Sequence, residues 1–230
     1  MSITTITGTT TLGVSLSSTA VLNETVVNYG TIDTAPTMNS AGVFFSSSGE
    51  VVNGSASATT ALIESEYFGV QIPGPVGVVD NFGTILASGV LVGVNLGDAS
   101  AATIVNGSTS DVTALIYGAG GGVAVGTGTV VNYGSILSSA LPEASNYGVA
   151  MLGGTSSSLL VNDGLIAGAV GVLAGDGVTI ANAGTIIGTG THELVFYFVV
   201  AIGLYRHRPG QSGGSLHAWT SRMFMVRLRL

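Results

Sequence analysis

The strongest candidates for catalytic side chains in this sequence are two neighbouring carboxylates. Glu64 and Glu66 lie two residues apart, so they point to one side if their segment is a β-strand. Two neighbouring carboxylates can act as general acid and general base, as they do in glycoside hydrolysis. Nothing else in the sequence supports the pair, and two solvated acids before a loop are the simpler interpretation. We therefore expect no catalytic residue.

Motifs that would bind a metal ion or a cofactor are incomplete. Gly175-Asp176-Gly177 matches one piece of the calcium-binding nonapeptide, but the piece is not repeated. The glycine-rich run at 118–122 lacks the Lys-Ser/Thr of a phosphate-binding P-loop. The three histidines, His192, His207 and His217, are too scattered for a metal-ligand spacing. The sequence thus predicts no metal ion and no cofactor.

Charged residues are few and segregated along the chain. Among 230 residues there are 12 Asp and Glu, 5 Lys and Arg, and a net charge of −7. No residue is Lys, all acids lie between Glu24 and Glu193, and all Arg lie from Arg206 onward. Nucleic acids and anionic membranes are bound through Lys and Arg, so we expect neither partner for residues 1–191. The same absence argues against a polysaccharide lyase, but a glycosidase that uses only carboxylates is left open.

Composition excludes several other classes of protein. Gly accounts for 36 residues without the period of collagen, and charged residues, at 7%, are too few for an ordinary disordered chain. Apolar residues, at 46%, are finely interleaved with Gly, Ser, Thr and Asn through residue 191, so no transmembrane helix is expected there. The first ten residues contain neither the basic nor the apolar region of a signal peptide, so we expect none.

A repeated unit organises most of the chain. It places an aliphatic residue two positions before an Asn, a Gly two positions after it and an Ile four positions after it. Full copies centre on Asn28, Asn81, Asn132, Asn162 and Asn182, and half-copies centre on Asn53 and Asn106. These Asn residues are 25, 28, 25, 26, 30 and 20 residues apart. Self-similarity at this period predicts a solenoid.

The spacing within the unit indicates β-strands. Positions two residues apart point to the same side of a strand, and a 3.6-residue helical period is absent. A second recurring piece, Gly followed by Val or Ala and a short apolar stretch, lies between the Asn-centred units, as at Gly148-Val149. Three short strands in each turn predict an all-β fold, a parallel β-helix of about seven coils over residues 1–191. Variable loops are expected at 33–41, 54–68, 97–103 and 138–147.

Stacked coils would turn each inward position into a ladder. We expect the aliphatic residues to form a narrow core and the Asn side chains to bond from coil to coil at a bend. The Gly after each Asn would permit a positive φ or a close approach of neighbouring coils. The predicted structural ladder consists of Asn28, Asn53, Asn81, Asn106, Asn132, Asn162 and Asn182, with Gly30, Gly83, Gly134, Gly164 and Gly184.

The repeat ends at His192. Residues 194–205 form an apolar run that is too short to span a bilayer as a helix. Three interpretations are open for residues 192–230: a membrane-proximal segment, the start of another domain, or translation out of frame. We favour translation out of frame, which predicts an out-of-pattern tail that is disordered or loosely docked on the last coil.

The pattern Val-x-Asn-x-Gly-Thr-Ile occurs at Val26–Ile32 and Val79–Ile85, and with Ile in the first place at Ile180–Ile186. Over about residues 20–190 it resembles the passenger region of bacterial autotransporters and related haemagglutinin-type adhesins. The resemblance implies a right-handed parallel β-helix at the bacterial cell surface, in the outer membrane or secreted. It also implies a non-enzymatic stalk or adhesin whose partner is a host-surface protein or carbohydrate.

Other roles are compatible with a β-solenoid. A β-helical carbohydrate-active enzyme, glycosidase-like and using surface carboxylates, would cluster three or more acids in one groove, whereas scattered acids favour the stalk. An ice- or surface-binding solenoid would need a regular Thr array; Thr31, Thr84 and Thr185 share an outward position, but the irregular coil lengths argue against one. Uncapped terminal coils would permit end-to-end self-association.

Overall fold

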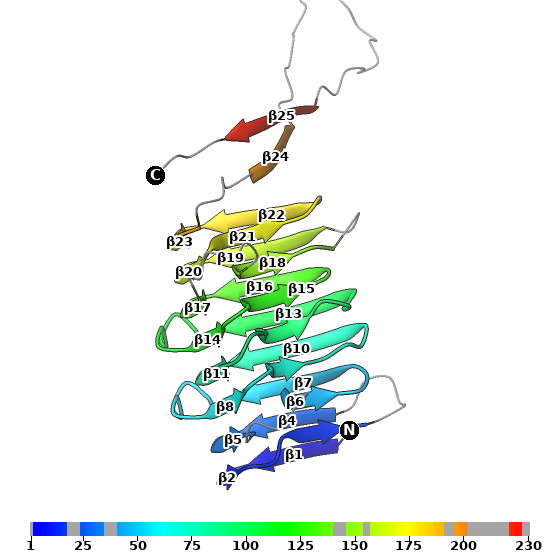
Figure 1. Cartoon of the computed structure of the whole chain (residues 1–230), viewed down its shortest axis with the longest axis vertical. Coiled ribbons are helices and arrows are strands. Elements are labelled where there is room, and N and C mark those ends of the chain that lie inside the picture. Colours follow the sequence, from blue (N-terminus) through cyan, green and yellow to red (C-terminus); the bar gives the residue numbers. More distant parts are fainter. Residues whose placement is uncertain are drawn as a thin grey trace, which may run out of the picture. The chain divides into compact units, whose positions relative to one another are not determined.

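The computed structural model describes residues 2–17, 24–34, 41–139, 146–153, 157–190, 196–201 and 221–226. The chain divides into two compact units, Met1–His192 and Glu193–Leu230. In the described part of the first unit the regular elements are all β-strands, and they build three parallel sheets (Figure 1).

Sheet A contains the strands that lead up to the Asn of the repeat. From β4 onward each of them ends at one of the seven ladder Asn residues, because the turn to the next strand begins there. The strands are β1 (Ser2–Ile6), β4 (Glu24–Asn28), β7 (Gly49–Asn53), β10 (Val76–Asn81), β13 (Ala101–Asn106), β16 (Gly128–Asn132), β19 (Ser158–Asn162) and β22 (Val178–Asn182).

Sheets B and C complete each turn. Sheet B begins with β2 (Thr9–Thr10), in which Thr10 pairs with Ile32. It then carries an inward Ile on each of β5 (Thr31–Asp33), β8 (Leu62–Ser65), β11 (Thr84–Ala87), β14 (Leu115–Gly118), β17 (Ser135–Ser138), β20 (Leu165–Gly168) and β23 (Thr185–Gly188). Sheet C carries the recurring Gly-Val piece on β3 (Val14–Leu16), β6 (Ala41–Phe45), β9 (Phe68–Gln71), β12 (Val92–Leu96), β15 (Gly121–Val125), β18 (Tyr147–Met151) and β21 (Val170–Ala174).

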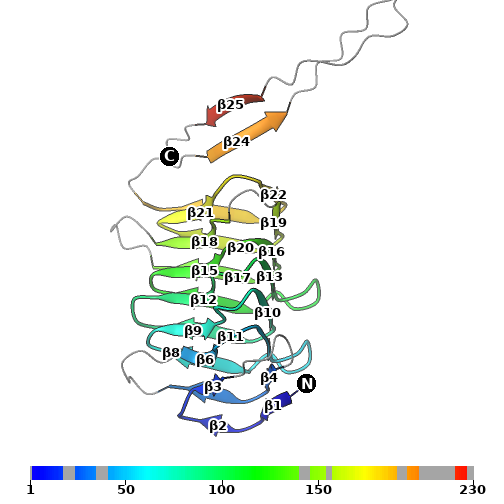
Figure 2. The same cartoon turned by 90° about the vertical axis from the view of Figure 1, so that its right-hand side faces the viewer.

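The register places like residues on like residues. Strands that are neighbours in a sheet belong to successive turns of the chain, and the coils lie one upon another (Figure 2). Val26 pairs with Val51, and Val51 pairs with Val79, in sheet A. Ile32 pairs with Ile63 in sheet B. The predicted all-β parallel β-helix of about seven coils is therefore confirmed.

One continuous core runs through the stack. The inward residues of all three sheets contribute to it, and the sheet B ladder of Ile32, Ile63, Ile85, Ile116, Ile136 and Ile166 has no exposed surface. Burying one such aliphatic side chain stabilises the fold by roughly 1.5–3 kcal/mol. Since each coil buries its side chains within itself and against the adjacent coils, stability accumulates coil by coil.

The predicted loops differ from the structure in their extent. Residues 54–68 include β8 and the start of β9, and residues 97–103 include the start of β13. For residues 54–68 the reason is an insertion. Ala61 follows Asn53 by eight residues, whereas Gly83 follows Asn81 by two, so the loop has six extra residues and β8 then begins at its usual place. An insertion of equal length after Asn106 was not predicted. The other two predicted loops begin and end within strands, and their centres, 35–40 and 140–145, are outside the described residues.

The second unit contains one antiparallel pair, β24 (Phe196–Ala201) with β25 (Ser221–Val226). The rest of residues 192–230 lies outside the described part of the chain, including His192, His207 and His217, so the predictions for this tail stay predictions. Within the described residues, no helix is long and apolar enough to span a bilayer.

Candidate functional site

The seven Asn residues form one hydrogen-bonded ladder along the solenoid. The side-chain Nδ2 of each donates to Oδ1 of the next, over distances of 2.7–2.8 Å. Asn28 through Asn162 have no exposed surface. Six such bonds therefore connect the coils from Asn28 to Asn182 through the interior.

Backbone carbonyls fix the direction of these amides. Nδ2 of Asn81 also donates to the carbonyl of Gly83 in its own coil at 3.1 Å and to that of Leu115 in the next coil at 3.1 Å. Two N–H groups thus serve three acceptors, so one bond is shared. If the amide were flipped, Oδ1 of Asn81 would face the carbonyl oxygens of Gly83 and Leu115, and oxygen would repel oxygen. Each ladder Asn from Asn28 to Asn162 consequently donates to the Asn of the following, more C-terminal coil.

The two ends of the ladder differ. At the N-terminal end Ile6 pairs with Asn28, so an apolar residue occupies the Asn position of the first coil. The free Oδ1 of Asn28 accepts from the backbone N–H of Gly30 at 3.1 Å. At the other end Asn182 is exposed and donates to Gly184 O at 3.2 Å. The ladder is closed where it begins and open to solvent where the described repeats end.

The ladder glycines pack closely against the preceding coil. Positive φ occurs at Gly54, Gly107, Gly128 and Gly177 and at none of the ladder glycines. A Cβ added to Gly83 would overlap the carbonyl oxygen of Ala61 in the coil before it. Gly30, Gly134, Gly164 and Gly184 meet the preceding coil in the same way. Of the two predicted reasons for these glycines, close approach is the one that applies.

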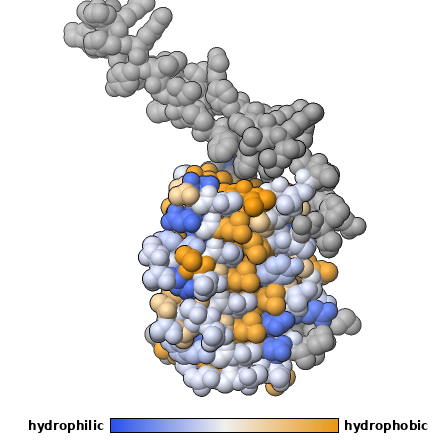
Figure 3. Space-filling view, turned by 90° about the vertical axis from the view of Figure 1, so that its left-hand side faces the viewer, coloured by the Kyte–Doolittle hydropathy of each residue, from blue (hydrophilic) through white to orange (hydrophobic). Residues whose placement is uncertain are grey.

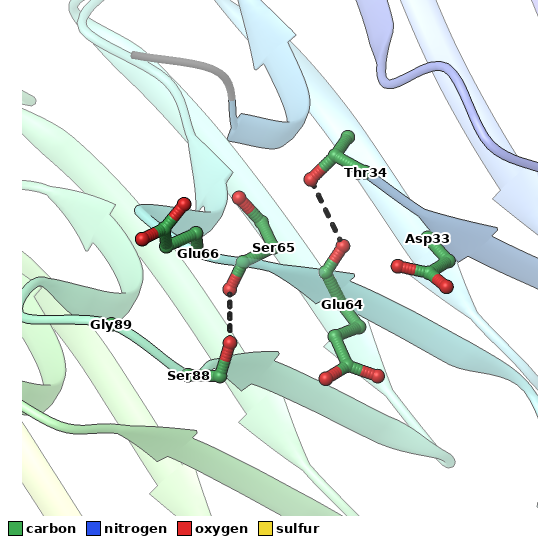
Figure 4. A pocket seen from close by; sticks show the side chains of 7 residues that line it. All are labelled: Asp33, Thr34, Glu64, Ser65, Glu66, Ser88 and Gly89. Atoms are coloured by element: carbon green, nitrogen blue, oxygen red, sulfur yellow. Dashed lines mark hydrogen bonds between the residues drawn. The ribbon is translucent and has the colours of Figure 1, made fainter. Parts of the chain in front are cut away.

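Three carboxylates line a hollow on the outer side of sheet B. Asp33 and Glu64 are register partners on β5 and β8, and Glu66 follows the end of β8. The hollow has a volume of about 320 Å³ and is completed by Thr34, Ser65, Ser88 and Gly89 (Figure 4). Three acids in one groove is the arrangement that the carbohydrate-active alternative requires.

The carboxylates of this acidic hollow do not converge. Glu66 lies beyond the strand, so the two-residue alternation does not apply to it, and Figure 4 shows Glu64 and Glu66 on different sides of Ser65. The backbone around them is held by a Thr34 Oγ1 bond to Glu64 O at 3.3 Å and a Ser88 Oγ bond to Ser65 O at 3.3 Å. Among the described residues, no group of three or more His, Cys, Asp or Glu is arranged to hold a metal ion.

A second acidic pair lies on the outer face of sheet A. Asp80 is half-buried, and burial together with the nearby charge of Glu50 raises its pKa above the ordinary value of 3.8. Thr25 Oγ1 donates to Glu50 Oε2 at 3.1 Å and holds that carboxylate in place. The neighbours of Asp80 in register are Val52 and Val105, which explains why solvation of its carboxylate is incomplete.

The outer face of sheet B changes character along the solenoid. The acidic column of Asp33 and Glu64 continues in register as Leu86, Tyr117, Leu137, Ala167 and Ile187. Figure 3 shows this as an apolar band with hydrophilic groups beside its N-terminal part. In the adjacent column Thr31, Thr84 and Thr185 are interrupted by Leu62, Leu115 and Leu165, so no continuous Thr array exists here.

Two loops of equal length project between sheets A and B, and we name them the twin loops, residues 54–60 and 107–113. Each begins with a Gly in the left-handed region, with φ of 82° at Gly54 and 79° at Gly107. Each contains a pair of hydroxyls in contact: Ser55 with Ser57 at 3.2 Å and Ser108 with Ser110 at 3.1 Å. The loops are therefore hydroxyl-rich and two coils apart.

Aromatic residues alternate with the twin loops along this corner. Tyr29, Phe82 and Tyr133 occupy the position after Asn in the three coils that flank and separate the twin loops, whereas Asp163 and Ala183 occupy it in the last two coils. Tyr29 is 45% exposed, whereas Phe82 and Tyr133 are half-buried. From Tyr29 to Tyr133 the corner thus offers a regular alternation of aromatic rings and polar loops.

Comparison of the chain with protein-family models, curated proteins and solved structures gives no match. The function therefore has to be inferred from the ladder, the acidic hollow and the loops.

Sequence reasoning missed two of these features. Asp33 was not associated with Glu64, because their pairing depends on the insertion that separates them by 31 residues rather than by one ordinary coil. The loop at 107–113 was missed although Asn106-Gly107-Ser108 copies Asn53-Gly54-Ser55. That copied tripeptide was the signal that could have revealed the second loop.

Proposed function

We propose that this chain is a non-enzymatic β-solenoid of the bacterial cell surface, either in the outer membrane or secreted, that acts as a stalk or adhesin. The observation that carries the proposal is the asparagine ladder. Its side chains use their hydrogen-bonding groups on one another and on neighbouring coils. The repeated residues therefore serve stacking, and the variable residues are free to form outward surface. The resemblance of the repeat to autotransporter passengers supports the location.

Ligand binding is assigned to the corner that carries the twin loops. These loops are outside the stacking pattern, so their residues can vary without loss of the core. Their hydroxyls can exchange hydrogen bonds with a host-surface carbohydrate or protein, and the aromatic rings between them can pack on apolar faces. The rod itself would hold this corner away from the surface to which it is attached.

Binding to immobilised glycans and host extracellular proteins tests the adhesin role. The matched variant replaces residues 54–60 and 107–113 each by a single Tyr, as in Asn132-Tyr133-Gly134. We expect the wild-type chain to bind and the variant to lose binding while its strand-dominated circular dichroism spectrum is unchanged. Equal binding by both would exclude the twin loops as the ligand site.

Labelling of intact cells of the source organism tests the location. Antibodies against the solenoid should stain intact cells or detect the chain in the culture medium. Staining that appears only after the cells are lysed would contradict the proposal. Lysine-directed labels cannot be used, because the chain contains no Lys.

The acidic hollow favours a second candidate function, a glycosidase-like carbohydrate-active enzyme. Asp33, Glu64 and Glu66 line one groove, which is the arrangement expected for that class. Release of reducing ends from polysaccharides would be measured for the wild type, for Glu64→Gln and for the exposed control Asp98→Asn. If the wild type and Asp98→Asn release reducing ends and Glu64→Gln does not, the chain is a carbohydrate-active enzyme and the non-enzymatic proposal is wrong.

End-to-end association of copies is a further part of the proposal. In a head-to-tail stack the exposed Asn182 of one copy would face Ile6 of the next copy. Ile6 occupies the Asn position of the first coil and has no side-chain oxygen to accept a hydrogen bond. We therefore expect such contacts to be weak and dependent on concentration. Sedimentation velocity over a range of concentrations tests this, and a stable long polymer at low concentration would contradict it.

A further inference from the structure

The chain contains two Asn-Gly dipeptides, Asn53-Gly54 and Asn106-Gly107, and both belong to the asparagine ladder. Two separate requirements create them. The ladder needs an amide at each of these positions, because it donates to the next Asn at 2.8 Å. The twin loop that follows needs a residue with φ near +80°, which Gly adopts without strain. The dipeptide is thus imposed by the architecture at the two coils that carry an insertion.

Asn-Gly is a chemically labile pair. The backbone nitrogen of the Gly, once it has lost its proton, attacks Cγ of the Asn side chain. A new N–Cγ bond forms, the Cγ–Nδ2 bond breaks and ammonia leaves, which gives a cyclic succinimide. Water then opens the ring to Asp or isoaspartate. Gly favours this reaction because it has no side chain to hinder the approach of its nitrogen.

The fold holds both reacting groups apart. The N–H of Gly54 donates to the carbonyl of Asn28, in the preceding coil, at 2.7 Å. The amide of Asn53 is bound in the opposite direction, to Asn81 Oδ1 at 2.8 Å and to Thr84 O at 3.0 Å in the following coil. Asn53 has no exposed surface, so neither hydroxide nor water reaches it.

The second dipeptide is held in the same way. Gly107 N–H donates to Asn81 O at 2.7 Å, and Asn106 donates to Asn132 Oδ1 at 2.8 Å and to Ser135 O at 3.0 Å. Asn106 also has no exposed surface. Repetition of the whole arrangement two coils later shows that it follows from the ladder rather than from one local accident.

We propose that Asn53 and Asn106 are latent deamidation sites, which are inert in the folded solenoid and react when their coils open. The product cannot restore the ladder. A carboxylate at position 53 has no N–H to donate, so it would place its charge against Asn81 Oδ1 and the carbonyl of Thr84. Isoaspartate would also lengthen the backbone by one atom within a buried turn. Deamidation during unfolding is thus a permanent covalent change, and the changed chain cannot return to the native state.

Mass spectrometry of the wild-type chain tests the reaction. The protein is incubated at mildly alkaline pH in buffer and in denaturant, and peptic peptides are followed over time. In denaturant, Asn53 and Asn106 should convert on the order of tenfold faster than Asn81, because Phe82 hinders attack at that site and Gly does not. In buffer the three sites should convert equally slowly. Conversion of Asn53 or Asn106 in buffer at the denatured rate would overturn the proposal.

Refolding tests the consequence. After increasing times in denaturant the chain is diluted, and folded and unfolded fractions are separated and analysed. The folded fraction should be depleted of chains converted at residue 53 or 106. Equal conversion in both fractions would overturn this part. Asn53→Asp imitates the product directly and should lose the cooperative transition, and Asn81→Asp should do the same, since the defect lies in the ladder and not in the dipeptide.

Discussion

Asn53 and Asn81 are 28 residues apart in the sequence, yet Nδ2 of the first donates to Oδ1 of the second across 2.8 Å with neither side chain exposed. This relationship repeats along the stack and makes each coil depend on its neighbours through a polar contact as well as through the core. Removing one member leaves unpaired groups on both sides. Stability measurements can therefore examine the ladder one position at a time.

Asn81→Ala should lower the free energy of unfolding by about 3 kcal/mol, because it leaves a donor of Asn53 and the acceptor of Asn106 unpaired in the interior. Urea unfolding measures the change. Asn182→Ala is the matched control, since Asn182 is exposed at the open end of the ladder and should cost well under half as much. Equal losses in the two variants would mean that burial of the ladder contributes nothing.

Gly83→Ala should destabilise the fold by about 1–3 kcal/mol, because its Cβ would overlap the carbonyl of Ala61 and force two coils apart. Gly8→Ala is the control at the corresponding position of the first coil, where an added Cβ meets nothing within 4 Å. Thermal unfolding of both variants measures the difference. A similar loss in Gly8→Ala would show that backbone flexibility, and not inter-coil contact, determines the cost.

Asp80 should make stability depend on pH. Burial, and then the charge of Glu50, raises its pKa in the folded protein above 3.8, so the folded state binds the proton more tightly than the unfolded state. The stability that this gives is fully present below pH 3.8 and is lost as the pH rises through the folded pKa. Asp80→Asn should therefore become progressively more stable than the wild type as the pH is raised to neutrality.

Denaturant unfolding across this pH range measures the effect, with exposed Asp98→Asn as the control. A difference between Asp80→Asn and the wild type that stays constant with pH would contradict the assignment.

Replacing residues 107–113 by a single Tyr should leave the free energy of unfolding within about 1 kcal/mol of the wild type, because loop length affects stability only weakly. The bond from Asn106 to Asn132 and the burial of Ile116 do not involve the loop. Urea unfolding tests this. Loss of the cooperative transition would show that the loop supports the corner rather than only presenting residues on it.

The coil architecture was predictable because its signal is repeated. The two-residue spacing of Val79, Asn81, Gly83 and Ile85 identifies one inward side, and recurrence of that spacing predicts that like residues stack. The direction of the Asn amides was not predictable, since it depends on carbonyls such as Leu115 O that come from the following coil. The sequence of a single repeat does not show which carbonyls of the following coil will lie beside its Asn.

The acidic hollow was harder to foresee for a related reason. Glu64 was recognised as half of a pair with Glu66, but its register partner is Asp33, on the far side of the insertion. Ala61 takes the place of the ladder Gly in that coil, so the pattern that would have marked the register is broken there. The register of a coil that contains an insertion can be assigned only once the regular coils on both sides of it have been aligned.

The one-way orientation of the ladder also makes its two ends unlike. Asn28 Oδ1 accepts from the backbone of its own coil, whereas the Nδ2 groups of Asn28 through Asn162 each donate to the Asn of the following coil. A coil that stacks on the C-terminal edge therefore meets the N–H groups of the exposed Asn182, whereas a coil that stacks on the N-terminal edge meets Ile6. The two ends of the solenoid thus offer chemically different surfaces to whatever packs on them.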